Sequence, residues 1–166
     1  KTVKQLIKQY PTHAKKRVLL VDVSEQRLYV FNRKAKLLKS YQVSTSAYGM
    51  SNRSNSNKTP IGAHQIKTKI GKNAKQFTIF KSLVNTGRLS RANSSGKALV
   101  TSRVLRLDGL EDSNRNTYRR YIYIHGTNKE KYLGKPKSHG CIRMSNDEVI
   151  ELFKETAKGS LVYLQE

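Results

Sequence analysis

The apolar residues of this chain fall into short blocks separated by polar turns, and this pattern constrains the fold more than any other feature. Val18–Val23 and Arg27–Phe31 are two such blocks, with the polar Ser24–Gln26 between them. Leu37–Ser44 follows and alternates between apolar and polar positions. Blocks of this length with period-two alternation are typical of β-strands. The pattern predicts a meander of three strands near the start of the chain.

Five more segments have strand character, and together they predict a mainly β domain. They are Ala63–Ile70, Phe77–Leu83, Lys97–Leu107, Arg120–His125 and Leu161–Leu164. Long polar loops are expected at 48–60 and 108–119. Many short strands with few helices favour a β-sandwich or a partly closed barrel.

Two short helices complete the predicted fold. Thr2 and Gln5 form a capping box ahead of apolar residues at helical spacing, which predicts a helix at the start of the chain. Ser145 and Glu148 form a second capping box, and the helix that follows is expected to end near Gly159. We expect the first helix to cover part of the core.

The chain has 33 Lys and Arg against 11 Asp and Glu, a formal net charge of +22. A field of this size attracts anionic polymers, including nucleic acid, acidic lipid and anionic cell wall, and does not choose among them. No apolar stretch approaches the roughly 20 residues of a membrane helix. We expect residues 1–16 to form a helix and linker packed on one domain at 17–166, with any export signal already trimmed.

A single cysteine, Cys141, makes an internal disulfide impossible. A lone thiol is often only a small buried apolar group. Here it follows Ser138, His139 and Gly140, and His125 with Gly126 stands upstream. A cysteine near its ordinary pKa is only a few per cent thiolate at neutral pH, so a nucleophilic one needs a nearby base such as imidazole.

These residues suggest a nucleophile, its base and an oxyanion site. His125, expected at the carboxyl end of its strand, would be the base, aimed by a backbone carbonyl near Gly126 or Thr127. Gly140 permits a tight turn, so the N–H groups of His139, Gly140 and Cys141 are expected oxyanion donors. An activated thiol of this kind is expected to react with iodoacetamide well below pH 8.

The other two histidines, His13 and His64, are predicted to lie on the surface.

The two segments closely resemble the catalytic signature of the L,D-transpeptidase family, also called the YkuD domain. The signature residues are His125 and then Ser138, His139, Gly140, Cys141, Ile142 and Arg143. Lys58–Gly62 resembles a further family element, and the resemblance spans roughly Arg17 to Leu164. It implies a β-sandwich of mixed sheets, with a helix after the cysteine loop.

The resemblance also implies a function. Cys141 would attack the carbonyl at the L-centre of a peptidoglycan stem tetrapeptide, release D-alanine and pass the acyl group to an amine. His125 would move the protons, Ser138 and Arg143 would contact substrate, and no metal or organic cofactor is implied. The location would be the periplasm or the extracellular cell wall. Anionic wall polymer is a second expected partner, through the basic surface, with no specific nucleic acid.

Three alternatives remain open from the sequence. A cysteine hydrolase on the same scaffold, such as an L,D-carboxypeptidase, would form the same thioester and resolve it with water. A zinc site would use His125, His139 and Cys141, although their spacing fits no zinc pattern known to us. A basic module that binds wall or nucleic acid would explain the charge, with an incidental cysteine. The role of Thr86–Arg119, the segment that resembles the family least, is left open, and a flap that shapes acceptor choice is one interpretation.

Overall fold

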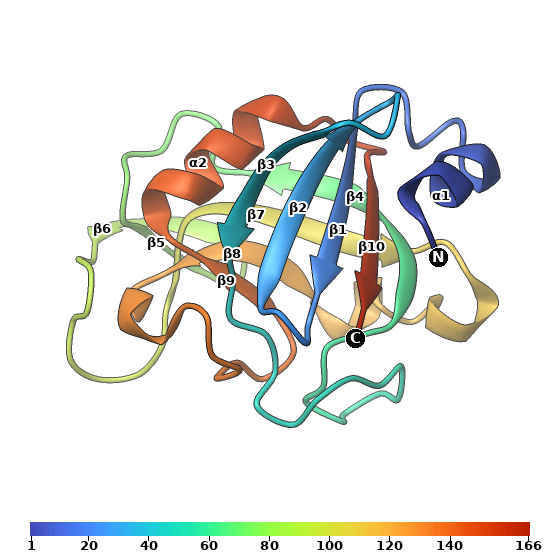
Figure 1. Ribbon diagram of the computed structural model, residues 1–166. Coiled ribbons are helices and arrows are strands. Elements are labelled where there is room, and N and C mark those ends of the chain that lie inside the picture. Colours follow the sequence, from blue (N-terminus) through green and yellow to red (C-terminus); the bar gives the residue numbers. More distant parts are fainter.

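The computed structural model describes residues 1–166 and contains ten strands, two α-helices and three short 3-10 helices (Figure 1). The elements in chain order are α1 (Val3–Gln9), β1 (Arg17–Asp22), β2 (Arg27–Asn32), β3 (Leu37–Gln42), β4 (Gly62–Ile70), β5 (Thr78–Lys81), β6 (Val84–Leu89), β7 (Val100–Gly109), η1 (Asp112–Asn114), η2 (Tyr118–Arg120), β8 (Tyr123–Thr127), η3 (Glu130–Tyr132), β9 (Ile142–Met144), α2 (Asn146–Glu155) and β10 (Leu161–Gln165).

The strands form one curled, mixed sheet, which confirms the predicted mainly β fold. Its main path runs β3-β2-β1-β10-β4-β7-β5-β6, and β8 joins through β7 and carries β9. The pairs β1–β10 and β8–β9 are parallel, and the remaining pairs are antiparallel. In Figure 1 the layer of β1, β2, β3 and β10 crosses in front of β7 and β8. The long strand β4 joins the two layers by pairing with both β10 and β7.

The main core fills the space between these layers and beneath α2. It contains 18 buried residues, among them Leu19, Leu28, Ile66, Leu105 and Leu152. These side chains come from strands far apart in the sequence, so burying them together closes the sandwich. The core therefore fixes β8 and β9, which carry the candidate site, as part of a rigid scaffold.

The N-terminal helix α1 forms as predicted. The Thr2 hydroxyl accepts a hydrogen bond from the Gln5 N–H, and the Gln5 side chain accepts one from the Thr2 N–H. Leu6 is fully buried in a second, smaller cluster with residues that include Val18 and Leu161. The helix thus covers one edge of the β1–β10 pair, as expected.

Several boundaries differ from the sequence prediction because strand pairing decides them. Phe77–Leu83 is not one strand: Ser82 and Leu83 adopt positive φ angles and the chain turns back as β6. That strand was missed because all six of its residues are exposed and lack an apolar face. The three-residue strand β9 was missed as well, since only its pairing with β8 defines it. Helix α2 ends at Glu155 rather than near Gly159.

The prediction that His64 lies on the surface is wrong. His64 is fully buried in β4, where its Nε2 lies 2.9 Å from the Thr117 hydroxyl and its Nδ1 lies 3.0 Å from the Gly62 carbonyl oxygen. Its strand is paired on both sides, so the polar side chain is held inside the fold. Burial lowers its pKa to about 4. His13 is half-buried, with its Nδ1 2.8 Å from the Gly159 carbonyl oxygen.

Candidate active site

The parallel pairing of β8 and β9 brings the two signature segments together. The register places Ile124 beside Ile142 and His125 beside Arg143. Cys141 directly precedes β9, so it lies next to the start of β8. The prediction that His125 ends its strand is wrong. Pairing with β7 and β9 extends β8 to Thr127.

Cys141 is held between backbone groups of the segment that leads into β8. Its Sγ accepts a hydrogen bond from the Tyr123 N–H at 3.3 Å and lies 3.4 Å from the Tyr121 carbonyl oxygen, to which the thiol donates. Burial raises the pKa of the thiol to about 11, and the Tyr123 N–H and the cations Arg143 and Arg120 act in the opposite direction. The thiol of Cys141 is therefore neutral at rest, although the Tyr123 N–H and the two cations oppose the effect of burial.

The ring of His125 is buried and fixed by the backbone. Its Nδ1 lies 2.6 Å from the Gly126 carbonyl oxygen, which accepts hydrogen bonds only, so Nδ1 carries the proton. In the neutral ring this leaves Nε2 with its lone pair free to accept a proton. Burial lowers the pKa of His125 to about 4, with a smaller contribution from Arg143 in the same direction and an opposing one from the Gly126 hydrogen bond. The expected orienting carbonyl near Gly126 is confirmed.

The turn before Cys141 is tied together by Ser138. The Ser138 hydroxyl donates to the Cys141 carbonyl at 2.6 Å and accepts from the Gly140 N–H at 3.2 Å. Gly140 adopts φ +128°, a conformation that side chains rarely permit, and an added Cβ would lie 3.3 Å from the Lys58 carbonyl oxygen. The Gly140 N–H is directed to the Ser138 hydroxyl within the same turn, and its role as an oxyanion donor stays a prediction. The N–H groups of His139 and Cys141 have no assigned partner.

Two hollows meet at this turn. One, of about 140 Å³, is lined by Ala98, Leu99, Val100, His125, Ser138, His139, Cys141 and Arg143. The predicted residues that carry functional side chains thus lie around one cavity. Arg143 is buried there and makes no ion pair, so its charge faces the cavity without a carboxylate partner.

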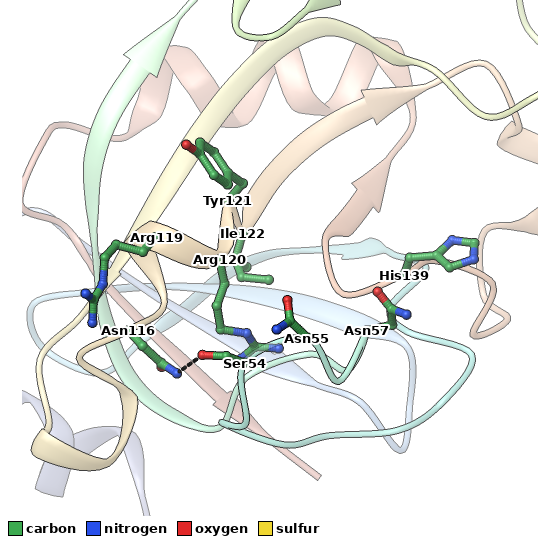
Figure 2. A pocket seen from close by; sticks show the side chains of 9 residues that line it. All are labelled: Ser54, Asn55, Asn57, Asn116, Arg119, Arg120, Tyr121, Ile122 and His139. Carbon is green, nitrogen blue, oxygen red and sulfur yellow. Dashed lines mark hydrogen bonds between the residues drawn. The ribbon is translucent and has the colours of Figure 1, made fainter.

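The second hollow, of about 490 Å³, lies between the loop at 51–58 and the η2 segment, with His139 at one end and Arg119 towards the other (Figure 2). It is lined by Ser54, Asn55, Asn57, Asn116, Arg119, Arg120, Tyr121, Ile122 and His139. His139 lines both hollows and also lies beside Tyr48, with ring centroids 5.8 Å apart. The site is therefore open to polar groups on both sides of the signature turn.

Several residues that shape this site were missed from the sequence. Arg120 donates to the carbonyl oxygens of Ser51 and Lys58, which holds the wall of the second hollow in place. Thr59 donates from its hydroxyl to the Gly140 carbonyl at 3.1 Å and so braces the turn. The Lys58–Gly62 resemblance pointed to Thr59, but nothing in the sequence pointed to Arg120.

Comparison with known proteins decides the family. A model of the L,D-transpeptidase catalytic domain, YkuD, matches residues 16–164 of this chain. The chain belongs to the L,D-transpeptidase family.

Two Bacillus subtilis (strain 168) proteins of the L,D-transpeptidase family share a short stretch of higher similarity. YqjB is 54% identical over 41 residues, which are 25% of this chain and 23% of YqjB. YkuD is 51% identical over 39 residues, 24% of each chain.

Solved L,D-transpeptidase structures share the fold over most of this chain. An L,D-transpeptidase from Mycobacterium smegmatis aligns with a TM-score of 0.60 and 15% identity, covering 91% of this chain and 59% of that one. L,D-transpeptidase 3 from Mycobacterium tuberculosis, in complex with a faropenem-derived adduct, aligns with a TM-score of 0.58 and 16% identity, covering 90% and 60%. The present chain spans about three-fifths of the length of these structures, and at this identity the likeness concerns the fold.

Two further features describe the L,D-transpeptidase domain as a whole. None of its helices has the length and apolar character needed to cross a bilayer. No three His, Cys, Asp or Glu side chains are grouped so that they could hold a metal ion in this structure.

The pKa of Cys141 predicts a slow alkylation reaction in the ligand-free protein. With a pKa of about 11, roughly one thiol in a thousand is ionised at pH 8, and the thiolate fraction rises as the pH increases towards 11. We therefore expect the iodoacetamide rate to climb about tenfold per pH unit between pH 7 and pH 10, contrary to the reaction well below pH 8 expected from the sequence. Intact-protein mass spectrometry of timed samples measures this rate. A plateau below pH 8 would contradict a neutral resting thiol.

Proposed function

We propose that this domain is a peptidoglycan L,D-transpeptidase whose nucleophile is Cys141 and whose base is His125. The observation that carries the proposal is the single cavity shared by the thiol, the buried imidazole with a free Nε2, and the unpaired cation Arg143. Membership of the family supports the same chemistry. The domain would act at the cell wall, in the periplasm or outside the cell.

In the first step the thiol attacks the carbonyl at the L-centre of the third stem residue. The proton on Sγ passes to Nε2 of His125 as the carbon–sulfur bond forms. Collapse of the tetrahedral intermediate breaks the bond to D-alanine, and His125 returns the proton to the leaving amine. The product is a thioester on Cys141. Because thiol and imidazole are both neutral beforehand, proton transfer accompanies the attack.

The oxyanion of this intermediate needs N–H donors close to Cys141. The N–H groups of Cys141 and His139 suit this role because no protein acceptor occupies them. Gly140 and Ser138 contribute by holding the turn that presents those donors. Ser138 also lines the cavity and would contact substrate there.

In the second step an amine attacks the thioester, and the stem acyl group is transferred. A side-chain amine of a neighbouring stem would give a 3–3 cross-link, and a free D-amino acid would give exchange. Arg143 in the smaller cavity is suited to a carboxylate of the stem, because a guanidinium binds carboxylates in a bidentate manner. The polar hollow with Arg119 and Arg120 offers a second anion-attracting wall for a stem peptide.

Hydrolysis of the same thioester by water is the alternative outcome, and it would make the domain an L,D-carboxypeptidase. The openness of the site to polar groups on both sides admits an amine as readily as water. The net charge of +22 would draw the domain to anionic wall polymer. Such attraction should weaken steeply as salt is added, since screening shortens its range.

Product analysis tests the proposal. The protein is incubated with a purified disaccharide-tetrapeptide and D-methionine, and the products are measured by mass spectrometry. We expect D-methionine to replace the terminal D-alanine and a transient thioester mass on Cys141. Loss of D-alanine without incorporation would instead support the carboxypeptidase. If Cys141 is never acylated by a stem peptide, the proposed function is wrong and the basic binding module becomes the better explanation.

A further inference from the structure

A third hollow, strongly basic, shares no residue with the two beside Cys141. It has a volume of about 560 Å³ and is lined by Lys69, Lys72, Asn73, Arg103, Phe153, Lys154 and Lys158. These residues come from β4, the loop after it, β7, α2 and the segment that follows α2. Five of the seven are Lys or Arg and none is acidic, so the hollow has a single sign of charge.

A β-bulge directs Arg103 to this place. The pairing of β7 with β8 shifts register between Thr101 and Val104, and Ser102 within the bulge has φ +66°. Bulges of this kind redirect a side chain and recur near functional sites. Arg103 is only 6% exposed, and its Nη1 donates to the carbonyl oxygens of Ala74 at 2.9 Å and Ser102 at 2.6 Å. Those bonds fix the guanidinium at the wall of the hollow.

Lys69 forms a second fixed cation in the same hollow. Its Nζ donates to the carbonyl oxygens of Phe153 and Thr156, both at 2.6 Å, and lies 4.2 Å from the centroid of the Phe153 ring. The two carbonyls belong to the end of α2, where partial negative charge favours a cation. Burial and the nearby Lys72 lower the pKa of Lys69.

No carboxylate compensates these cations. The protein has two ion pairs, and both join Lys39 to α2, through Glu151 and Glu155. A buried guanidinium without an anionic partner is costly to keep in a fold. The neighbouring Ser102, which is not a glycine, also adopts a positive φ angle in the bulge. Backbone strain of this kind is often found at functional sites. The positive charge of this hollow is therefore not compensated within the chain, and an anion from outside would compensate it.

We propose that this basic hollow binds the phosphoryl groups of a phosphodiester polymer. The fixed guanidinium of Arg103 suits two oxygens of a phosphoryl group, and the exposed Lys72, Lys154 and Lys158 approach from separate elements, as a tetrahedral anion requires. A planar carboxylate is satisfied by one guanidinium and would leave these lysines unused. The binding is independent of acyl transfer at Cys141.

A polymer in solution fits this hollow better than a lipid head group does. A surface that inserts into a bilayer presents exposed apolar side chains beside its cations. The exposed large apolar residues of this protein are Leu37, Leu38, Tyr48, Ile61, Val84, Leu89 and Tyr121, and none lines the hollow. The occupant is therefore expected to be a water-soluble phosphodiester chain.

The test compares two variants of equal net charge. One combines Lys72→Gln, Lys154→Gln and Lys158→Gln, and the control combines Lys8→Gln, Lys34→Gln and Lys36→Gln, which are exposed and lie elsewhere. Binding of poly(glycerol phosphate) is measured by isothermal titration at 150 mM salt. We expect the hollow variant to bind about tenfold more weakly and the control to stay within about twofold of the parent protein. Thermal unfolding confirms that both variants fold.

Two further binding experiments use inorganic phosphate and lipid vesicles. Titration of inorganic phosphate should shift the amide resonances of Ala74 and Phe153 in the parent protein, and the hollow variant should need about tenfold more phosphate for the same shift. Equal weakening in the two triple variants would overturn the proposal in favour of diffuse attraction. Binding to phosphatidylglycerol vesicles but not to the polymer would also overturn it. D-alanine exchange on a soluble tetrapeptide should be unchanged in both variants, so this result is distinguishable from failure of the proposed acyl transfer.

Discussion

Replacing Cys141 with alanine is expected to reduce D-methionine incorporation below detection, by a factor on the order of 10⁴ or more. The substitution removes the only thiol of the chain, so no other side chain can form the thioester. The backbone N–H donors near position 141 would remain, but no nucleophile would be present to form the oxyanion. Mass spectrometry of the products and of the intact protein measures both the exchange and the acyl-enzyme.

Replacing Cys141 with serine tests the same role with a smaller change in structure. Cys141→Ser keeps the contacts to the Tyr123 N–H and the Tyr121 carbonyl but presents a far weaker acid than a thiol. We expect it to fold like the parent protein and to show no exchange within the same detection limit. Exchange that persists in Cys141→Ala at more than a few per cent of the parent rate would mean that the acyl group is carried elsewhere.

Replacing His125 with alanine is expected to lower the exchange rate by about 10²–10⁴, the usual contribution of a positioned base. The lost group is the ring whose Nε2 is left free by the Nδ1 bond to Gly126. The thiol of Cys141 would remain protonated because burial still raises its pKa. Rates measured at several pH values separate this effect from simple misfolding.

The pH profile provides the distinguishing measurement for His125. Its pKa of about 4 lies below the ordinary 6.5, so the ring is neutral and able to accept a proton at any pH above about 4. The rate should therefore fall as the pH drops through about 4, rather than through about 6.5, and this limb should vanish in His125→Ala. An acid limb centred near 6.5 would contradict the enclosed, neutral base.

His64 supplies a matched control for His125. It is also a buried histidine with a pKa of about 4, but its ring contacts Thr117 and the Gly62 carbonyl instead of the cavity. His64→Gln is expected to lower the melting temperature while leaving the exchange rate of the folded protein and its pH profile unchanged. If the two histidine variants lose activity equally, the loss reflects disturbance of the fold and not a role in proton transfer.

Much of the fold was predictable because local rules and burial agree in those segments. The alternating apolar blocks identify β1, β2 and β4 to within one residue or so, since each buries one or both faces in the core. The Thr2–Gln5 capping box marks the start of α1 because the two side chains satisfy N–H groups within the same turn. These features depend on residues that are close together in the chain, so they can be predicted from the sequence.

The grouping of the candidate site residues was also predictable, because they occupy two short segments. Residue type and spacing singled out Cys141, His125 and Gly126, and their chemical roles stay a prediction. The orienting carbonyl of Gly126 follows from its position next to the histidine. Spacing does not give the protonation state of these groups. The thiol is neutral because burial in the folded protein raises its pKa to about 11.

Only the tertiary structure decided the features that depend on partners distant in sequence. The strand β9 exists because β8 pairs with it, and the same pairing carries β8 past His125. Arg120 reaches the site by bonding to a loop more than sixty residues earlier, and Arg103 is placed in the basic hollow by a bulge against β8. These placements arise from long-range hydrogen bonding and burial, which residue types and local spacing do not encode.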